Sequence, residues 1–169
     1  MDRADRRAGR LWTQIPTGVV AVPLAPGVAE GVWESNRETY DRFSDPPVAH
    51  GARFTFHRGR LTEYSFTQGG AAFDRAYLRG GRGRELPGAL TFGVNPAISR
   101  APEVGEIAAG TVGLLLGGNR SLGGRNPSRF AYLTTLGDAK VDLDGEPFLE
   151  EGTLVPRARD SKSTGASVE

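Results

Sequence analysis

The sequence predicts an α+β fold: a strand-rich single domain with antiparallel hairpins and one or two short helices. The chain has 169 residues, 38% of them hydrophobic and 24% charged, which is the size and composition of one globular domain. Its 24 glycines and 11 prolines favour short strands and tight turns over long helices. Apolar residues alternate with polar ones in several runs of strand length, whereas helical spacing is found in only a few places.

The two ends of the chain lie outside the predicted domain. Residues 1–10 carry four Arg and two Asp and one large apolar residue, Met1, which is typical of a flexible arm. After Val155 the sequence PRARDSKSTGASVE has almost no apolar residues, which predicts a disordered tail at 156–169. The domain is therefore expected to span residues 11–155.

The first half of the domain contains the clearest local unit, a hairpin over 52–66. Phe54 and Phe56 alternate with polar residues, as do Tyr64 and Phe66, and Arg58-Gly59 supplies the turn between the two strands. Further elements are expected as a strand near 18–22 closed by Pro23, a long connection over 30–47, and a short helix in which Ala72, Phe73, Ala76 and Tyr77 repeat at helical spacing before Gly80-Gly81.

In the second half, the run TVGLLL at 111–116 is continuously apolar and suits the centre of a sheet. The loop that follows, GGNRSLGGRNPS, is rich in Gly and Asn, so its backbone is expected to adopt positive φ or to approach another segment closely. The other expected elements are strands at 90–94, 129–135 and 139–143, a helical turn at 102–109, and a turn at Asp144-Gly145 leading into Pro147-Phe148-Leu149.

Charge and composition exclude several classes of function. The net charge is +1, which gives little electrostatic support for binding a nucleic acid. No apolar run approaches the roughly 20 residues that a membrane-spanning helix needs, and the N-terminus has no signal-peptide centre. We therefore expect a cytoplasmic protein with neither nucleic acid nor membrane as a partner.

The residues that usually carry catalysis or bind metals are scarce. There is no Cys, and the two histidines, His50 and His57, have no acidic partner at a recognised metal spacing. The acidic run DAKVDLDGE at 138–146 lacks the twelve-residue calcium pattern, and no G-x-S-x-G elbow or phosphate-binding glycine motif is present. The sequence predicts no cofactor and favours a binding module over an enzyme.

Four segments resemble a known family when they are read in order. They are IPTGVVAVP at 15–23, LPGALTFGVNPAI at 86–98, GTVGLLLGGNRSLGGRN at 110–126 and VDLDGEPFLEEG at 141–152. These blocks are similar, in the same order, to the C-terminal domain of the metallo-aminopeptidases of the aminopeptidase T and aminopeptidase S family. The resemblance covers about residues 15–152, implies the fold of that C-terminal domain, and leaves out the whole N-terminal domain.

The resemblance also implies where a metal site would lie, and this chain departs from the family at every one of those positions. The family binds two metal ions through Glu, His, Tyr and Asp side chains. The matching positions here hold Val19, Ala89, Gly113, Arg120, Ala131 and Leu133. None of these side chains is a metal ligand, and Arg120 adds a positive charge that would repel a divalent cation.

A scaffold that keeps its shape but lacks its ligands is suited to holding a peptide without cutting it, through main-chain pairing at sheet edges. The hypothesis is therefore a non-catalytic peptide-binding protein that holds a peptide, for example a ribosomal precursor peptide, for other enzymes of a biosynthetic or processing pathway. Its candidate contacts are Asn95, Asn119, Arg120, Arg129 and Tyr132, with the arginines pairing with carboxylates.

Two alternatives remain open from the sequence. One is an enzyme with a rebuilt site that uses Asp138, Asp142 or Glu106 as acid or base. The other is a structural or assembly subunit, because members of the family form dimers and the missing N-terminal domain would leave surface uncovered. A homodimer is expected in either the binding or the structural case.

Overall fold

The computed structural model describes residues 18–37, 40–41, 49–97 and 108–155. The predicted arm at 1–10 and tail at 156–169 lie outside the described residues. So do Glu106 and all but the last two residues of the helical turn expected at 102–109.

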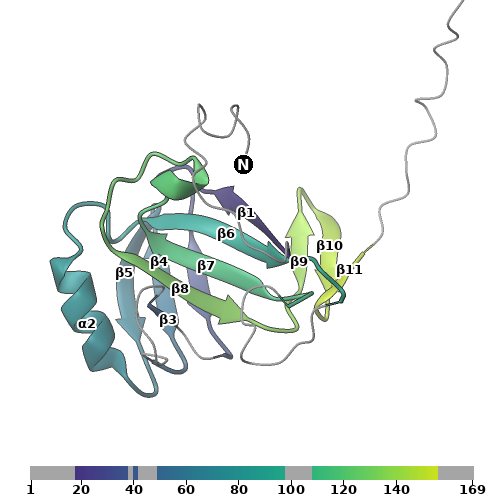
Figure 1. Ribbon diagram of the computed structural model, residues 1–169, viewed down its shortest axis with the longest axis horizontal. Coiled ribbons are helices and arrows are strands. Elements are labelled where there is room, and N and C mark those ends of the chain that lie inside the picture. The colour runs from purple at the N-terminus through teal and green to yellow at the C-terminus, as the bar shows by residue number, and fades with distance from the viewer. Residues whose placement is uncertain (1–17, 38–39, 42–48, 98–107, 156–169) are drawn as a thin grey trace, which may run out of the picture.

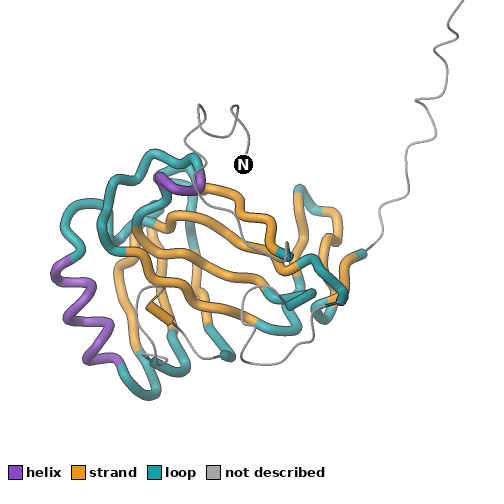
Figure 2. The backbone as a smooth tube through the Cα atoms, viewed as in Figure 1, coloured by secondary structure: helices purple, strands orange, loops and turns teal. Residues whose placement is uncertain are grey.

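The fold is mostly β, and the predicted α+β class is wrong. The described residues form eleven strands in three antiparallel sheets, with one α-helix and one 3-10 turn (Figures 1 and 2). The short helix expected from the spacing of Ala72, Phe73, Ala76 and Tyr77 is confirmed as α2, Gly70–Arg79, which is the only helix of more than one turn among the described residues. The strands are β1 Val19–Pro23, β2 Gly31–Glu34, β3 Tyr40–Asp41, β4 Arg53–His57, β5 Arg60–Ser65, β6 Pro87–Gly93, β7 Val112–Gly117, β8 Ala131–Leu136, β9 Val141–Leu143, β10 Glu146–Glu150 and β11 Thr153–Leu154.

The largest sheet, here called the main sheet, has the strand order β1-β6-β7-β8-β3. Its centre is β7, as the apolar run at 111–116 predicted. All six residues of β7 are buried, because both faces of the sheet are covered at this strand.

The hairpin sheet, with the order β2-β4-β5, packs with α2 against the inner face of the main sheet. Between these layers lies an aromatic core that includes Phe54, Phe73, Phe130 and Tyr132. Phe73 and Tyr132 meet edge to face with ring centroids 4.8 Å apart, a geometry that adds to the energy of area burial.

The C-terminal sheet, with the order β11-β10-β9, lies at the opposite end of the molecule from α2 (Figure 1). It closes a second cluster in which Leu149 and Phe148 pack against Phe92 and Val112 of the main sheet. The expected turn at Asp144-Gly145 is confirmed, with φ of 55° and 84°, and the expected turn at Arg58-Gly59 likewise has positive φ at both residues.

The long connection expected at 30–47 is partly wrong, because it contains β2 and β3. β2 pairs along its length with β4, and β3 pairs with β8, which is about ninety residues away in sequence. Strands that gain their stability from a distant partner carry little local signal. No helix in the described part of the chain has both the length and the apolar character needed to cross a membrane.

Candidate functional site

Five of the six positions that the resemblance singles out lie on one face of the main sheet. Ala89 on β6 and Leu133 on β8 both pair with Leu115 on β7, so the three side chains point to the same side. Residues two apart on a strand share a face, which places Gly113, Ala131 and Val19 there too. We call this the outer face, since the aromatic core lies on the other side.

The outer face is apolar at the centre of these positions. Ala89, Leu115 and Leu133 form a buried cluster with exposed fractions of 0%, 3% and 6%, and Leu122 and Ala131 pack against it. No group of three or more metal-ligating side chains occurs in the parts of the chain that the structure describes. Alkyl side chains offer no lone pair to a cation, so this face has the chemistry of a packed core rather than of a metal centre.

The space at Gly113 is already occupied. A Cβ atom built on Gly113 would collide with the Thr91 hydroxyl and come within 3.1 Å of the Leu133 side chain. A histidine at this position, which the family pattern would require, would have to displace Thr91. Thr91 itself is 3% exposed, and its Oγ1 has no hydrogen-bond partner within the described structure. The outer face around Gly113 is therefore filled by neighbouring side chains and, among the described residues, offers no metal-ligating group.

Asn119 is a structural residue, which corrects its assignment as a peptide contact. It is 2% exposed; its Nδ2 donates to the Gly88 carbonyl at 2.6 Å, and its Oδ1 accepts from the Asn126 amide at 2.9 Å. Because the side chain is buried and both ends of its amide are bonded inside the protein, Asn119 is not accessible to a ligand in this structure. Its function is to hold the glycine-rich loop against β6.

Tyr132 is also unsuited to contact a peptide. It is 0% exposed, lies on the inner face of the main sheet, and stacks parallel to Phe130 with centroids 6.0 Å apart. The alternation of β8 explains the difference, because Tyr132 lies between Ala131 and Leu133, which point to the outer face. Sequence alone did not fix which parity of β8 faces the core.

The other candidate contacts are distributed over the two ends of the main sheet. Arg120 begins the 3-10 turn η2, Arg120–Leu122, and both Arg120 and Arg129 are exposed with no ion pair to any described residue. Asn95 lies at the far end of β6, where it bridges to Ala108 and its Oδ1 accepts from the Ala97 amide at 3.0 Å. The structure thus groups Arg120 with Arg129 on one loop and separates both from Asn95.

The edge strand β1 has β6 on one side and no strand of the described structure on the other, which we call its open edge. The bonds from Leu24 N–H to Gly88 and from Val94 N–H to Gly18 show that even-numbered residues of this strand bond to β6. Val19 and Ala21 therefore direct their N–H and C=O groups outward, and these groups have no hydrogen bond to any described residue. Val20 and Val22 are 50% and 45% exposed. Sequence reasoning missed this edge because strand order cannot be read from β1 alone.

An open cavity of about 720 Å³ lies elsewhere, at the C-terminal sheet. It contains none of the predicted contacts, but Asp138, which the enzymatic alternative invoked, is part of its wall. The lining residues are Asp138, Lys140, Glu150, Glu151, Thr153, Leu154 and Val155.

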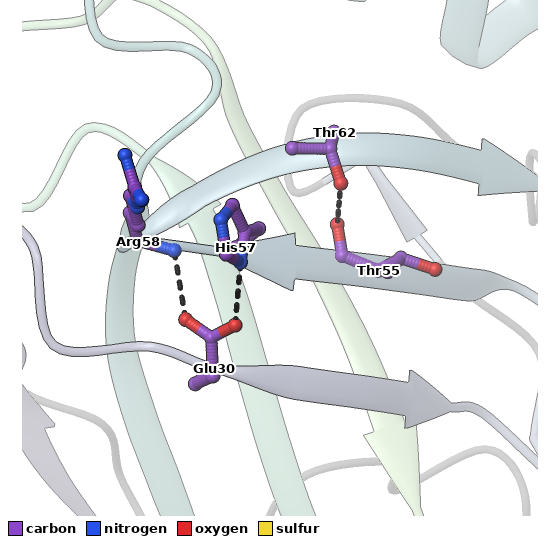
Figure 3. Close-up of polar contacts among 5 residues, drawn as sticks. All are labelled: Glu30, Thr55, His57, Arg58 and Thr62. Atoms are coloured by element: carbon purple, nitrogen blue, oxygen red, sulfur yellow. Dashed lines mark hydrogen bonds and ion pairs between the residues drawn. The ribbon is translucent and has the colours of Figure 1, made fainter.

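The two histidines have structural surroundings. His57 Nδ1 lies 2.7 Å from Glu30 Oε1, while the Arg58 amide donates to Glu30 Oε2 at 2.8 Å (Figure 3). The Arg58 amide, and after it His57, holds the pKa of the Glu30 carboxyl below its usual value. These bonds tie the turn of the β4–β5 hairpin to the start of β2. His50 bridges to Gln68 through the backbone.

Comparison with known proteins adds information about the fold. No family model and no curated protein matches the chain. Among solved structures, 2,5-dihydroxypyridine dioxygenase from Pseudomonas putida KT2440 is similar, with a TM-score of 0.63 and 12% identity over 81% of this chain and 43% of the dioxygenase chain. At that identity the likeness shows a shared fold alone, and this chain spans less than half the length of that enzyme.

Proposed function

We propose that this chain is a non-catalytic peptide-binding protein of the cytoplasm, which holds a peptide, such as a ribosomal precursor peptide, for modifying enzymes of a pathway. The observation that carries the proposal is the open edge of β1. Val19 and Ala21 offer outward N–H and C=O groups, and Val20 and Val22 add exposed apolar surface beside them. An extended peptide can extend the main sheet by pairing with such an edge.

The outer face supports the same proposal. Metal-dependent chemistry at the positions implied by the resemblance would need ligand side chains at Ala89 and Gly113, where there is only a methyl group and a hydrogen atom. The collision at Gly113 with Thr91 shows that the neighbouring side chains are packed around the small residues. A main-chain edge, by contrast, needs no particular side chain, so it can persist when catalytic residues are lost.

The test is a substitution that removes one outward donor from the open edge without removing a donor to β6. Ala21→Pro deletes the outward N–H, while the bonds to β6 are made by Val20 and Val22. Ala21→Ser keeps the N–H and is the matched control. Binding of a panel of fluorescent extended peptides, measured by anisotropy, is expected to weaken about tenfold in the Pro variant and to stay unchanged in the Ser variant. Equal binding by both variants, or no binding by the wild type, contradicts the proposal.

A homodimer through β1 is the structural alternative, since two copies could pair their open edges about a two-fold axis. Sedimentation over a range of concentrations separates the two cases. If Ala21→Pro turns a dimer into a monomer and leaves peptide binding unchanged, the edge of β1 forms the dimer interface, and the proposal that a peptide binds at this edge is wrong. The enzymatic alternative predicts a hydrolase activity that Asp138→Asn abolishes, because Asp138 lines the cavity at the C-terminal sheet.

A further inference from the structure

Exposed arginines gather where the C-terminal end of α2 meets the glycine-rich loop between β7 and β8. Arg79 ends α2, Arg82 follows in the connection to β6, and Arg125 and Arg129 lie on the glycine-rich loop. All four side chains are exposed, and none makes an ion pair or a hydrogen bond with a residue of the described structure. We call these four residues the arginine surface.

Two hydrogen bonds join the two chain segments that carry the four arginines. The Ser128 hydroxyl donates to the Gly80 carbonyl at 3.0 Å, and Asn126 Nδ2 donates to the Gly83 carbonyl at 2.8 Å. Each arginine is the immediate chain neighbour of one of these four bonded residues: Arg79 of Gly80, Arg82 of Gly83, Arg125 of Asn126 and Arg129 of Ser128. Residues far apart in sequence are therefore brought to one small area.

The backbone under the arginine surface is fixed in advance. Asn126 is 7% exposed and also donates to the Gly117 carbonyl at 2.8 Å, which ties the loop to the end of β7. A Cβ atom on Gly80 would collide with Phe130, so α2 and the start of β8 are in direct contact. A charged surface on a fixed backbone loses little conformational freedom when it binds.

Two other arginines near this surface do have partners within the protein, which provides a comparison. Arg84 lies with its guanidinium 4.8 Å from the centre of the Tyr77 ring, and it donates to the Leu78 carbonyl at 2.8 Å. Arg60 likewise pairs with Glu85 at 2.5 Å. The four residues of the arginine surface have no such partner among the described residues, so their capacity for bidentate bonds to carboxylates is unused.

The opposite end of the molecule carries the opposite charge. The C-terminal sheet and its turns hold six exposed acidic side chains, Asp138, Asp142, Asp144, Glu146, Glu150 and Glu151, and one basic one, Lys140. Figure 1 shows α2 and this sheet at the two ends of the long axis. The net charge of +1 is therefore the sum over a chain that has a positive region, the arginine surface, and a separate negative region, the C-terminal sheet.

We infer that the arginine surface binds the acidic side chains of a peptide, which names the ligand class of the proposed peptide-binding function and rests on that function. A short acidic segment would experience only the local positive field, because salt screens charges beyond about 8 Å. A nucleic acid would extend toward the acidic sheet and would lack rings to stack on. Among the aromatic residues whose exposure the structure describes, Tyr64 is the most exposed at only 38%, and its hydroxyl is bonded to Asp74.

The test uses four probes of similar length, about twelve units. Three are capped peptides in which Val alternates with Glu, Gln or Lys, and the fourth is a single-stranded oligothymidylate. The protein variants are the quadruple R79Q/R82Q/R125Q/R129Q and a matched control, R53Q/R58Q/R60Q/K140Q, which removes the same charge from the hairpin and C-terminal sheets. Thermal unfolding verifies that each variant is folded.

The wild type is expected to bind the Glu peptide at least about tenfold more tightly than the Gln peptide, with the Lys peptide weakest. The quadruple variant is expected to lose this preference, the control to keep it, and high salt to reduce it. Equal loss in the control would assign the effect to net charge and overturn the inference. Tighter, arginine-dependent binding of the oligothymidylate would also overturn it in favour of a phosphate ligand.

The outcomes separate this inference from the proposed function. If the Gln peptide binds as well as the Glu peptide, and Ala21→Pro weakens both, the protein binds peptides and the arginine surface has no part in it. If the arginine substitutions weaken binding of the Glu peptide but Ala21→Pro does not, the inference of an acidic peptide ligand is supported and the proposal of main-chain pairing at β1 is wrong. If no peptide of any charge binds, both proposals are wrong.

Discussion

The two faces of the main sheet are built from different side chains, although they share the same strands. The inner face carries Tyr132, Leu114 and Leu116, which pack into an aromatic core with the hairpin sheet and α2. The outer face carries Ala89, Gly113 and other small or aliphatic residues at the positions that the resemblance associates with metal ions. The comparison indicates that the aromatic packing of the inner face holds the fold together without placing any constraint on the chemistry of the outer face.

The largest expected effect concerns the inner face. Phe73→Ala removes a fully buried ring that contacts Phe54, Phe66, Tyr77 and Tyr132, and should lower the free energy of unfolding by about 3–5 kcal/mol. Urea denaturation measures the loss. Leu78→Ala on the same helix is the control, because Leu78 is 68% exposed, and it should change stability by less than about 0.5 kcal/mol.

The glycine-rich loop at the end of the sheet should be the next most sensitive region. Asn126→Ala leaves the carbonyls of Gly83 and Gly117 and the Ser128 amide without their partner, at a cost of about 2–4 kcal/mol. The neighbouring substitution Arg125→Ala should be nearly neutral, since that side chain is exposed. Similar losses for both variants in urea denaturation would contradict the structural function assigned to Asn126.

The outer face is expected to be tightly packed despite its small residues. Gly113→Ala should cost about 1–3 kcal/mol, because the new methyl group collides with the Thr91 hydroxyl. Thr91→Ala in the same chain should restore at least about 1 kcal/mol relative to the sum of the single changes. Additive effects of the two substitutions would mean that these side chains do not compete for one space.

The hydroxyl of Thr91 allows a test in the stabilising direction. Thr91→Val replaces a buried, unbonded hydroxyl by a methyl group of similar size, and should raise the free energy of unfolding by about 0–1 kcal/mol. Thr134→Val is the matched control on the same sheet, because the Thr134 hydroxyl bonds to the Leu114 carbonyl and its loss should be destabilising. A destabilised Thr91→Val variant would show that this hydroxyl has a function in the folded protein.

Much of the fold could be predicted from local sequence. The hairpin at 52–66 was predictable because Arg58-Gly59 both turns the chain and lies between two alternating runs. β2 and β3 were missed, because their stability comes from pairing with β4 and β8. The general class was wrong because one amphipathic helix of ten residues contributes little beside three sheets.

The candidate site was less predictable than the fold. Asn119 and Tyr132 are predicted as contacts because they lie in the loop and strand next to the positions that the resemblance implies, but burial assigns the first to the anchoring of a loop and the second to the core. The arginine surface depends on a contact between residues 80–83 and 126–128. These segments are far apart in the sequence, so no local sequence pattern predicts that they meet. Arg129 was therefore predicted as a contact from the sequence, whereas Arg79, Arg82 and Arg125 were not.

The smallest expected effect on stability concerns Tyr64, at the edge of the aromatic core, whose hydroxyl donates to Asp74 at 2.8 Å. Burial, and after it the Asp74 carboxylate, raises the pKa of Tyr64 to about 12. Because the folded pKa exceeds the unfolded value of about 10, this stabilisation is complete below pH 10 and is lost as the pH rises through 12. Tyr64→Phe should therefore show a shallower fall of unfolding free energy over that range than the wild type. An absorbance titration in which Asp74→Asn leaves the Tyr64 transition unmoved would limit the cause to burial alone.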